Sequence, residues 1–121
     1  MAKKSAESFL PLTQATYYIL ISLTEPLHGY GIMQKVEEMS GGEVRLGPGT
    51  LYGALSKLEK DKAIEKLDGD GRRKVYQLSD FGKELIRLDY LRMAKTLEAS
   101  KPYLKHFLKG SGTYEADEKS L

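Results

Sequence analysis

Apolar side chains along the first half of the chain recur every three to four residues, which is the spacing of amphipathic helices. This pattern predicts helices over residues 12–24, 29–40 and 48–60. We expect Pro26 to end the first helix, because proline disrupts a helix interior, and Leu27-His28 to start the second. Apolar residues occur on both faces of the first helix, so a further helix or a second subunit should cover it. Residues 43–46 alternate between polar and apolar, which predicts a very short strand.

The third of these helices has an unusual outer face. Its apolar stripe follows the i, i+3, i+4, i+7 spacing and consists of Leu51, Ala54, Leu55 and Leu58. The opposite face carries Gly49, Gly53, Ser56 and Lys60. So small a face is suited to approach another molecule closely, and a nucleic-acid groove is the leading candidate. An ordinary amphipathic helix that tolerates two glycines explains the pattern equally well.

Two short strands are predicted after the third helix. Residues 63–67 and 72–78 flank Asp68-Gly69-Asp70-Gly71, a strong turn signal, so they should form a hairpin. The second and third helices, joined by a glycine-bearing turn, form a helix-turn-helix pattern, and a hairpin directly after it is the wing of a winged helix. We therefore predict a mainly α fold with a small β-hairpin: a winged helix-turn-helix plus a long C-terminal dimerisation helix.

The long C-terminal helix is predicted to begin after Ser79, which can cap it. Mostly apolar residues recur in it at alternating spacings of four and three, which is a heptad seam. The seam consists of Ile86, Tyr90, Met93, Leu97, Ser100, Leu104 and Phe107. A seam on a single helix needs a partner, so we expect a homodimer. Pro102 should kink the helix or start a separate short helix with Ser100 as its cap.

These patterns divide the 121 residues into four segments. They are a flexible N-terminus over 1–10, a winged helix-turn-helix DNA-binding domain over 11–79, a dimerisation helix over 80–109 and a disordered tail over 110–121. The net charge is +2, but residues 1–109 carry eighteen basic and fourteen acidic side chains, and the rest carries a net −2. A mildly basic body binds nucleic acid only if its bases cluster, and the densest cluster is Arg72-Arg73-Lys74.

Composition and spacing disfavour several classes of function. The absence of cysteine excludes disulfides and thiol nucleophiles and fits a reducing compartment. No apolar run is long enough to span a membrane, and Lys3-Lys4 precedes no signal-peptide core, so we expect a cytoplasmic protein. His28 and His106 lie far apart, and no nucleophile–base pair or paired carboxylates stand out. We therefore expect no metal, no cofactor and no enzymatic activity.

Three segments, in this order and at this spacing, resemble the PadR family of transcriptional regulators. They are His28-Gly29-Tyr30-Gly31-Ile32, then Pro48-Gly49-Thr50-Leu51-Tyr52 with Ala54-Leu55 and Leu58-Glu59, then Arg72-Arg73-Lys74-Val75-Tyr76-Gln77-Leu78-Ser79 with Gly82. The similarity covers roughly residues 11–100. The chain looks like the short-tailed branch, in which one C-terminal helix makes the dimer. That branch includes repressors of drug-efflux and stress genes, some of which bind flat aromatic compounds at the dimer interface.

The resemblance implies that the third helix (about 48–60) enters the major groove of DNA and that the wing (about 68–74) contacts phosphates. The DNA-binding residues expected on this basis are Tyr30, Pro48, Gly49, Thr50, Tyr52, Ser56, Lys57, Arg72, Arg73 and Lys74. For Tyr52 the alternative is a half-buried core tyrosine. For the three wing bases the alternative is a solvated run of charges.

The resemblance also implies a dimer interface that can hold an effector. The residues expected there are Tyr17, Tyr18, Ile21, Ile86, Tyr90, Met93, Leu97, Leu104 and Phe107. A dimer core filled by its own side chains is the alternative, and this chain lacks the tryptophans between which some relatives stack drugs.

The predicted function is a homodimeric regulator that binds double-stranded DNA at a pseudo-palindromic operator. We expect a repressor that is relieved by a small effector, with an aromatic compound as the candidate. The alternative is a winged-helix module for protein–protein contact without effector binding.

Overall fold

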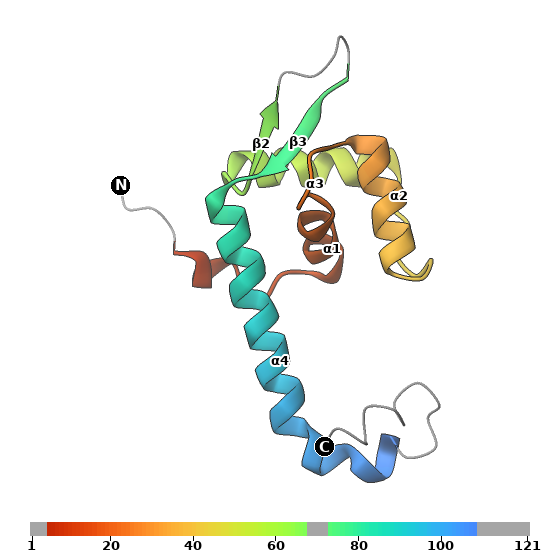
Figure 1. Cartoon of the computed structure of the whole chain (residues 1–121), viewed down its shortest axis with the longest axis vertical. Helices are drawn as coiled ribbons and strands as arrows, with labels where there is room; N and C mark the ends of the chain where they lie inside the picture. Colours follow the sequence, from red (N-terminus) through yellow and green to blue (C-terminus); the bar gives the residue numbers. More distant parts are fainter. Residues whose placement is uncertain (1–4, 68–72, 109–121) are drawn as a thin grey trace. The chain divides into compact units, whose positions relative to one another are not determined.

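The computed structural model describes residues 5–67 and 73–108, and its helices and the hairpin follow the predicted order (Figure 1). The elements are the 3-10 helix η1 (Ala6–Phe9), α1 (Gln14–Ser22), β1 (Leu27–His28), α2 (Gly29–Met39), α3 (Pro48–Lys60), β2 (Ile64–Leu67), β3 (Val75–Leu78) and α4 (Asp80–Leu108). The chain divides into two compact units, Met1–Asp89 and Tyr90–Leu121, and α4 contributes residues to both. The predicted fold class, mainly α with a small sheet and a long C-terminal helix, is confirmed.

The first helix is shorter at both ends than the apolar pattern predicts. α1 begins at Gln14 because Thr13 caps it: Thr13 Oγ1 accepts a hydrogen bond from the Thr16 amide at 3.1 Å. The helix ends at Ser22, before the chain reaches Pro26. Pro26 is therefore not the residue that ends it, and that prediction is wrong.

Two predictions about the connecting segments are also wrong. Leu27-His28 does not start a helix but forms β1, since the edge of β3 offers it hydrogen-bond partners. Residues 43–46 form no strand in the structure. There the Val44 amide instead donates a hydrogen bond to the Ser40 hydroxyl at 2.9 Å, which folds the segment back onto the end of α2.

The small sheet is antiparallel and has the order β1-β3-β2. The predicted hairpin is confirmed, with Ile64 opposite Leu78 and Leu67 opposite Val75. β1 extends the hairpin on the far side of β3, where Leu27 lies opposite Tyr76. The strands are shorter than predicted, and the tip of the wing, residues 68–72, lies outside the described residues.

Both α2 and α3 end in the hydrogen-bond pattern of a Schellman motif. After α2, the Gly42 amide donates to the carbonyl five residues earlier at 2.8 Å, and Gly41 adopts φ +63°. After α3, the Ala63 amide makes the equivalent bond at 2.9 Å, and the left-handed residue is Lys62, with φ +66°. Glycine takes this conformation readily, whereas a residue with a side chain such as Lys62 pays on the order of 1 kcal/mol for it. The predicted break of the second helix at Ser40-Gly41-Gly42 is confirmed.

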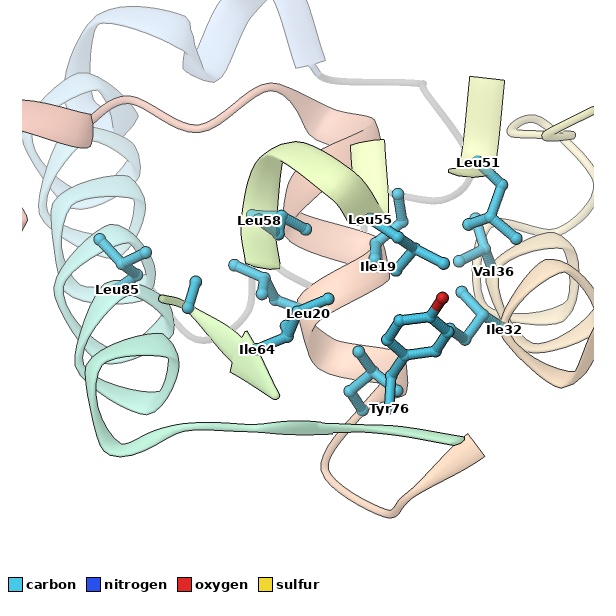
Figure 2. Close-up of a cluster of buried hydrophobic side chains, with 12 residues drawn as sticks. Ile19, Leu20, Ile32, Val36, Leu51, Leu55, Leu58, Ile64, Tyr76 and Leu85 are labelled. Carbon is cyan, nitrogen blue, oxygen red and sulfur yellow. The ribbon is translucent and has the colours of Figure 1, made fainter. Parts of the chain in front are cut away.

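The core of the first unit combines the apolar faces of its helices and its sheet. The buried side chains are Ile19, Leu20, Leu23, Ile32, Val36, Leu51, Leu55, Leu58, Ala63, Ile64, Tyr76 and Leu85. Figure 2 shows the ring of Tyr76 directed into this cluster beside Ile32. The apolar stripe predicted for α3 is confirmed, because three of its members are fully buried and Ala54 packs against them.

α4 begins at the cap that the sequence predicts. Ser79 Oγ accepts a hydrogen bond from the Gly82 amide at 3.0 Å and donates one to the Lys62 carbonyl at 2.6 Å. Gly82 lies so close to the start of β2 that a Cβ on it would come 3.1 Å from the carbonyl carbon of Ala63. The absence of a side chain at Gly82 therefore lets the first turn of α4 meet the end of α3 and the start of β2.

α4 runs through Pro102 as one helix, and Figure 1 shows it bending near its C-terminal end. Of the two predicted outcomes, the kink agrees with this course and the separate short helix does not. The Ser100 hydroxyl donates to the Leu97 carbonyl at 3.0 Å and so does not cap a new helix.

The terminal segments were predicted to be flexible or disordered. In the N-terminal one, residues 6–9 form η1, and the ring of Phe9 meets that of Phe81 edge-on with centroids 5.4 Å apart. Residues 1–4 and the predicted tail over 110–121 lie outside the described part of the chain. The predicted disorder of these segments stays a prediction.

Candidate nucleic-acid interface

Four of the predicted contact residues come together around one groove on the first unit. The groove lies where the first turns of α2, the outer face of α3 and the base of the wing meet. Its lining consists of His28, Gly29, Tyr30, Gly31, Gln34, Tyr52, Arg73 and Lys74. The described residues of the lining contain no carboxylate, while Arg73 and Lys74 supply two cations. These two cations attract an anionic backbone that enters the groove.

The other predicted contact residues of α3 lie outside this groove. Pro48, Gly49, Thr50, Ser56 and Lys57 are all exposed. A Cβ built on Gly49 or on Gly53 would meet nothing within 4 Å, so the backbone of the first turns is open to close approach. Pro48 occupies the first helical turn, as predicted.

Tyr52 borders the groove and also lies against α2. Its side chain is 46% exposed and lines the groove, yet the phenol end rests against the first residue of α2. A Cβ on Gly29 would lie 2.8 Å from Cζ of Tyr52. Tyr52 is thus half-buried and also available to a partner.

The buried Tyr76 lies on the core side of this arrangement. Burial raises the pKa of its phenol, and the nearby Glu59 carboxylate and Tyr52 raise the pKa further. Tyr76 therefore stays neutral and uncharged at physiological pH.

Two charged residues in the last turn of α3 are paired with residues that follow the helix. Lys57 Nζ lies 2.9 Å from Asp61 Oδ2, and Lys66 Nζ lies 3.8 Å from Glu59 Oε2. Such exposed pairs contribute about 0–1 kcal/mol, so a phosphate can draw a lysine away at little cost. Lys57, which the sequence predicts to contact DNA, thus forms an ion pair within the chain.

The basic wing cluster is only partly placed by the structure. Arg73 and Lys74 are exposed immediately before β3 and line the groove. Arg72 lies outside the described residues, so its predicted phosphate contact stays a prediction.

Four residues of the groove were not among the predicted contact residues: His28, Gly29, Gly31 and Gln34. Gln34 lies four residues after Tyr30, on the same side of α2, and that spacing was the available signal. His28 carries the buried atom Nδ1, for which the described residues provide no hydrogen-bond partner. No sequence signal predicts this, because it depends on β1 pairing with β3.

The residues predicted for a dimer interface or effector pocket occur in both units, and each unit is described by itself. In the first, Tyr17, Tyr18, Ile21 and Ile86 are half-buried. In the second, more than half of the surface is exposed for Tyr90, Leu97, Tyr103 and Phe107. Leu91 is 50% exposed, and Met93 and Leu104 are half-buried. Exposed apolar side chains in such number along one helix indicate a surface that a partner covers.

The described residues show neither a cluster of metal ligands nor a membrane-spanning helix. Histidines, aspartates and glutamates do not gather there in groups of three that could hold a metal ion. Nor does any of the described helices combine the length and the apolar character that crossing a membrane requires.

Comparison with solved structures places the fold. A PadR family transcription regulator from hypervirulent Clostridium difficile superimposes with a TM-score of 0.66, at 24% identity, over 74% of this chain and 97% of that one. RosR from H. salinarum superimposes with a TM-score of 0.62, at 26% identity, over 93% of this chain and 99% of that one. F93 from STIV, described as a winged-helix DNA-binding protein, gives 0.59 at 19% identity over 67% and 88%. These likenesses confirm the winged-helix fold.

Comparison of sequences places the family. A protein of 37.1 kDa in transposon TN4556 of Streptomyces fradiae, itself uncharacterized, is 40% identical over 82 residues. That match covers 67% of this chain and 23% of the relative, so the chain spans about a quarter of that protein's length. The model of the transcriptional regulator PadR-like family matches residues 19–88, more than half of the chain. The chain therefore belongs to the PadR-like family of transcriptional regulators.

Proposed function

We propose that the chain is a homodimeric, cytoplasmic regulator that binds double-stranded DNA and represses transcription until a small effector relieves it. Its α3 enters the major groove of a pseudo-palindromic operator, and its wing, about residues 68–74, contacts phosphates. Two α3 helices related by the dimer axis read half-sites about 34 Å apart, which is one turn of DNA.

The groove between α2, α3 and the wing carries this proposal. It joins Tyr30, Tyr52, Arg73 and Lys74 from three separate elements, and its described residues include no carboxylate. Tyrosine hydroxyls and cationic side chains donate hydrogen bonds to phosphate oxygens. A winged helix used only for protein contact has no need for a groove with this charge.

The outer face of α3 supports a position inside the major groove. Gly49 and Gly53 leave its backbone uncovered, and Thr50 and Ser56 place small hydroxyls on the same exposed surface. A helix that enters the groove deeply needs a slim leading face, and short polar tips reach base edges there. Base contacts by these residues would set sequence preference, while Arg73 and Lys74 would set affinity and salt dependence.

The effector, in this proposal, acts through the dimer interface. Tyr17, Tyr18, Tyr90 and Met93 supply aromatic and thioether side chains suited to a flat apolar compound. Such a compound can shift the spacing of the two α3 helices only if it binds one dimer arrangement more tightly than the other.

The test replaces Tyr52 with alanine and measures affinity for DNA that the unaltered chain selects from random fragments. We expect Tyr52→Ala to weaken binding by about tenfold or more, since a direct groove contact is worth about 1–3 kcal/mol. Thr96→Ala is the control: Thr96 is exposed, lies on α4 outside the heptad seam and is absent from the groove, so the loss of its side chain should leave DNA affinity unchanged.

A salt series separates DNA binding from the protein–protein alternative. Binding through phosphates must weaken steeply as salt rises, because each neutralised phosphate releases counterions. If the unaltered chain selects no DNA, or binds it without a salt dependence, the proposal fails and the protein-contact module takes its place.

A further inference from the structure

The exposed tyrosine of α3 is supported from behind by a residue that has no side chain. Gly29 is the first residue of α2 and is buried. A Cβ on Gly29 would lie 2.8 Å from Cζ and 3.2 Å from Cε1 of Tyr52, with the hydroxyl oxygen closer still. Real Cβ atoms do not approach other atoms so closely, so any side chain at Gly29 must displace the Tyr52 ring.

The open groove lies beside the same ring. Tyr52 is 46% exposed and lines the groove together with Gly29. The hydroxyl end of the ring therefore lies against the backbone of Gly29, and the rest of the ring borders open space.

We infer that Gly29 is a positioning residue for DNA binding: its missing side chain creates the seat in which the Tyr52 ring is held toward the groove. This inference rests on the proposed function and deepens it, because it assigns a role to a residue that need not touch DNA. A ring that is fixed before binding loses less rotamer freedom when DNA arrives, which favours affinity. A ring that is pushed out of its seat loses this advantage and also obstructs the groove.

The experiment is a double-mutant cycle on the 121-residue chain with Gly29→Ala and Tyr52→Ala. We expect Gly29→Ala alone to weaken DNA binding by about threefold to tenfold. In the Tyr52→Ala background the same change should cause no further loss, because no ring remains to displace. In thermal unfolding, Tyr52→Phe should reduce the effect of Gly29→Ala, since the hydroxyl is the atom nearest to the added methyl group.

Thermal unfolding gives a second readout that does not depend on DNA. With Tyr52 present, Gly29→Ala should lower Tm by about 2–5 °C. With Tyr52→Ala, the same change should leave Tm unchanged or raise it, because alanine is a better helix former than glycine. A general defect of α2 would lower Tm equally in both backgrounds.

Gly31→Ala is the matched control within the same helical turn. Gly31 also lines the groove, but a Cβ on it would meet Cδ2 of Leu27 at 3.3 Å and not Tyr52. The change in binding free energy caused by Gly31→Ala, whatever its size, should therefore add to the change caused by Tyr52→Ala.

The outcomes separate the two proposals. If the unaltered chain binds no DNA, the proposed function fails, and the Tm cycle alone decides whether Gly29 seats the ring. If DNA is bound but the effects of Gly29→Ala and Tyr52→Ala add within about twofold, the positioning role is overturned. A Gly29→Ala variant that binds as tightly as the unaltered chain overturns it as well.

Discussion

Glycines occur in this chain for different reasons, and the surroundings of each Cα distinguish them. Gly41 adopts φ +63° and ends α2. Gly29 and Gly82 face neighbours so close that a Cβ at either position would clash, with Tyr52 in one case and with Ala63 in the other. Gly53 has none of these reasons, since a Cβ on it would meet open space. In the proposed complex that space is where DNA lies.

Gly53→Ala should therefore change stability and DNA affinity in opposite directions. Alanine in an exposed helix interior is more favourable than glycine by about 0.5–1 kcal/mol, so Tm should rise. DNA affinity should fall by roughly 1 kcal/mol or more if the groove wall packs on this position, because an added methyl group overpacks a close contact. Thermal unfolding and operator titration measure the two effects, and a more stable variant with undiminished affinity would contradict close approach by α3.

At the scale of elements, the end of α3 and the start of α4 are joined through one side chain. Ser79 Oγ accepts from the Gly82 amide within α4 and donates to the Lys62 carbonyl in the turn after α3. The Ser79 amide also donates to the Ala63 carbonyl at 3.1 Å. The helix proposed to read DNA and the helix that begins after the wing thus share one hydrogen-bonded joint.

Ser79→Ala should loosen this joint. It removes a helix cap and leaves the Lys62 carbonyl without its partner, which we expect to cost about 1–2 kcal/mol of unfolding free energy. Ser79→Asp is the informative comparison, because a carboxylate can still accept from the Gly82 amide but cannot donate to the Lys62 carbonyl. Ser79→Asp should therefore lose less unfolding free energy than Ser79→Ala. Chemical denaturation measures both variants, and an unchanged stability of Ser79→Ala would show that these side-chain hydrogen bonds do not stabilise the fold.

At the scale of the whole molecule, the second unit has more apolar surface than a helix in water requires. Tyr90, Leu97 and Phe107 are 59%, 64% and 75% exposed, and they belong to the heptad seam. A second copy of the seam would cover them by knobs-into-holes packing. The same association would give the two reading helices that a palindromic operator needs.

Leu97→Glu should separate the protomers, because it places a charge in the middle of the seam opposite its own copy. Sedimentation or light scattering should show a monomer at concentrations where the unaltered chain is a dimer. Operator affinity should fall by about tenfold or more, since the two half-sites no longer bind as a linked pair. Thr96→Glu adds the same charge one residue away from the seam and should leave the dimer intact. A Leu97→Glu variant that stays dimeric would exclude this seam as the interface.

Much of the fold was predictable because its strongest signals are local. The bounds of α3, the glycine break after α2, the hairpin and the Ser79 cap each follow from a few consecutive residues, and the structure confirms them. One error fell where distant segments meet. Leu27-His28 became a strand because β3 lies beside it, a pairing across nearly fifty residues that no local pattern reports.

The candidate site was predictable by residue type but not by arrangement. The sequence by itself determined a helix with a slim outer face, a basic segment at the wing and a seam that needs a partner, because periodicity and turn chemistry are properties of neighbours in the chain. Only the tertiary structure decided that Arg73 and Lys74 join Tyr30 and Tyr52 around one groove and that Gly29 lies against Tyr52. Those contacts depend on how α2, α3 and the wing pack, and packing is settled by the shared core rather than by any one segment.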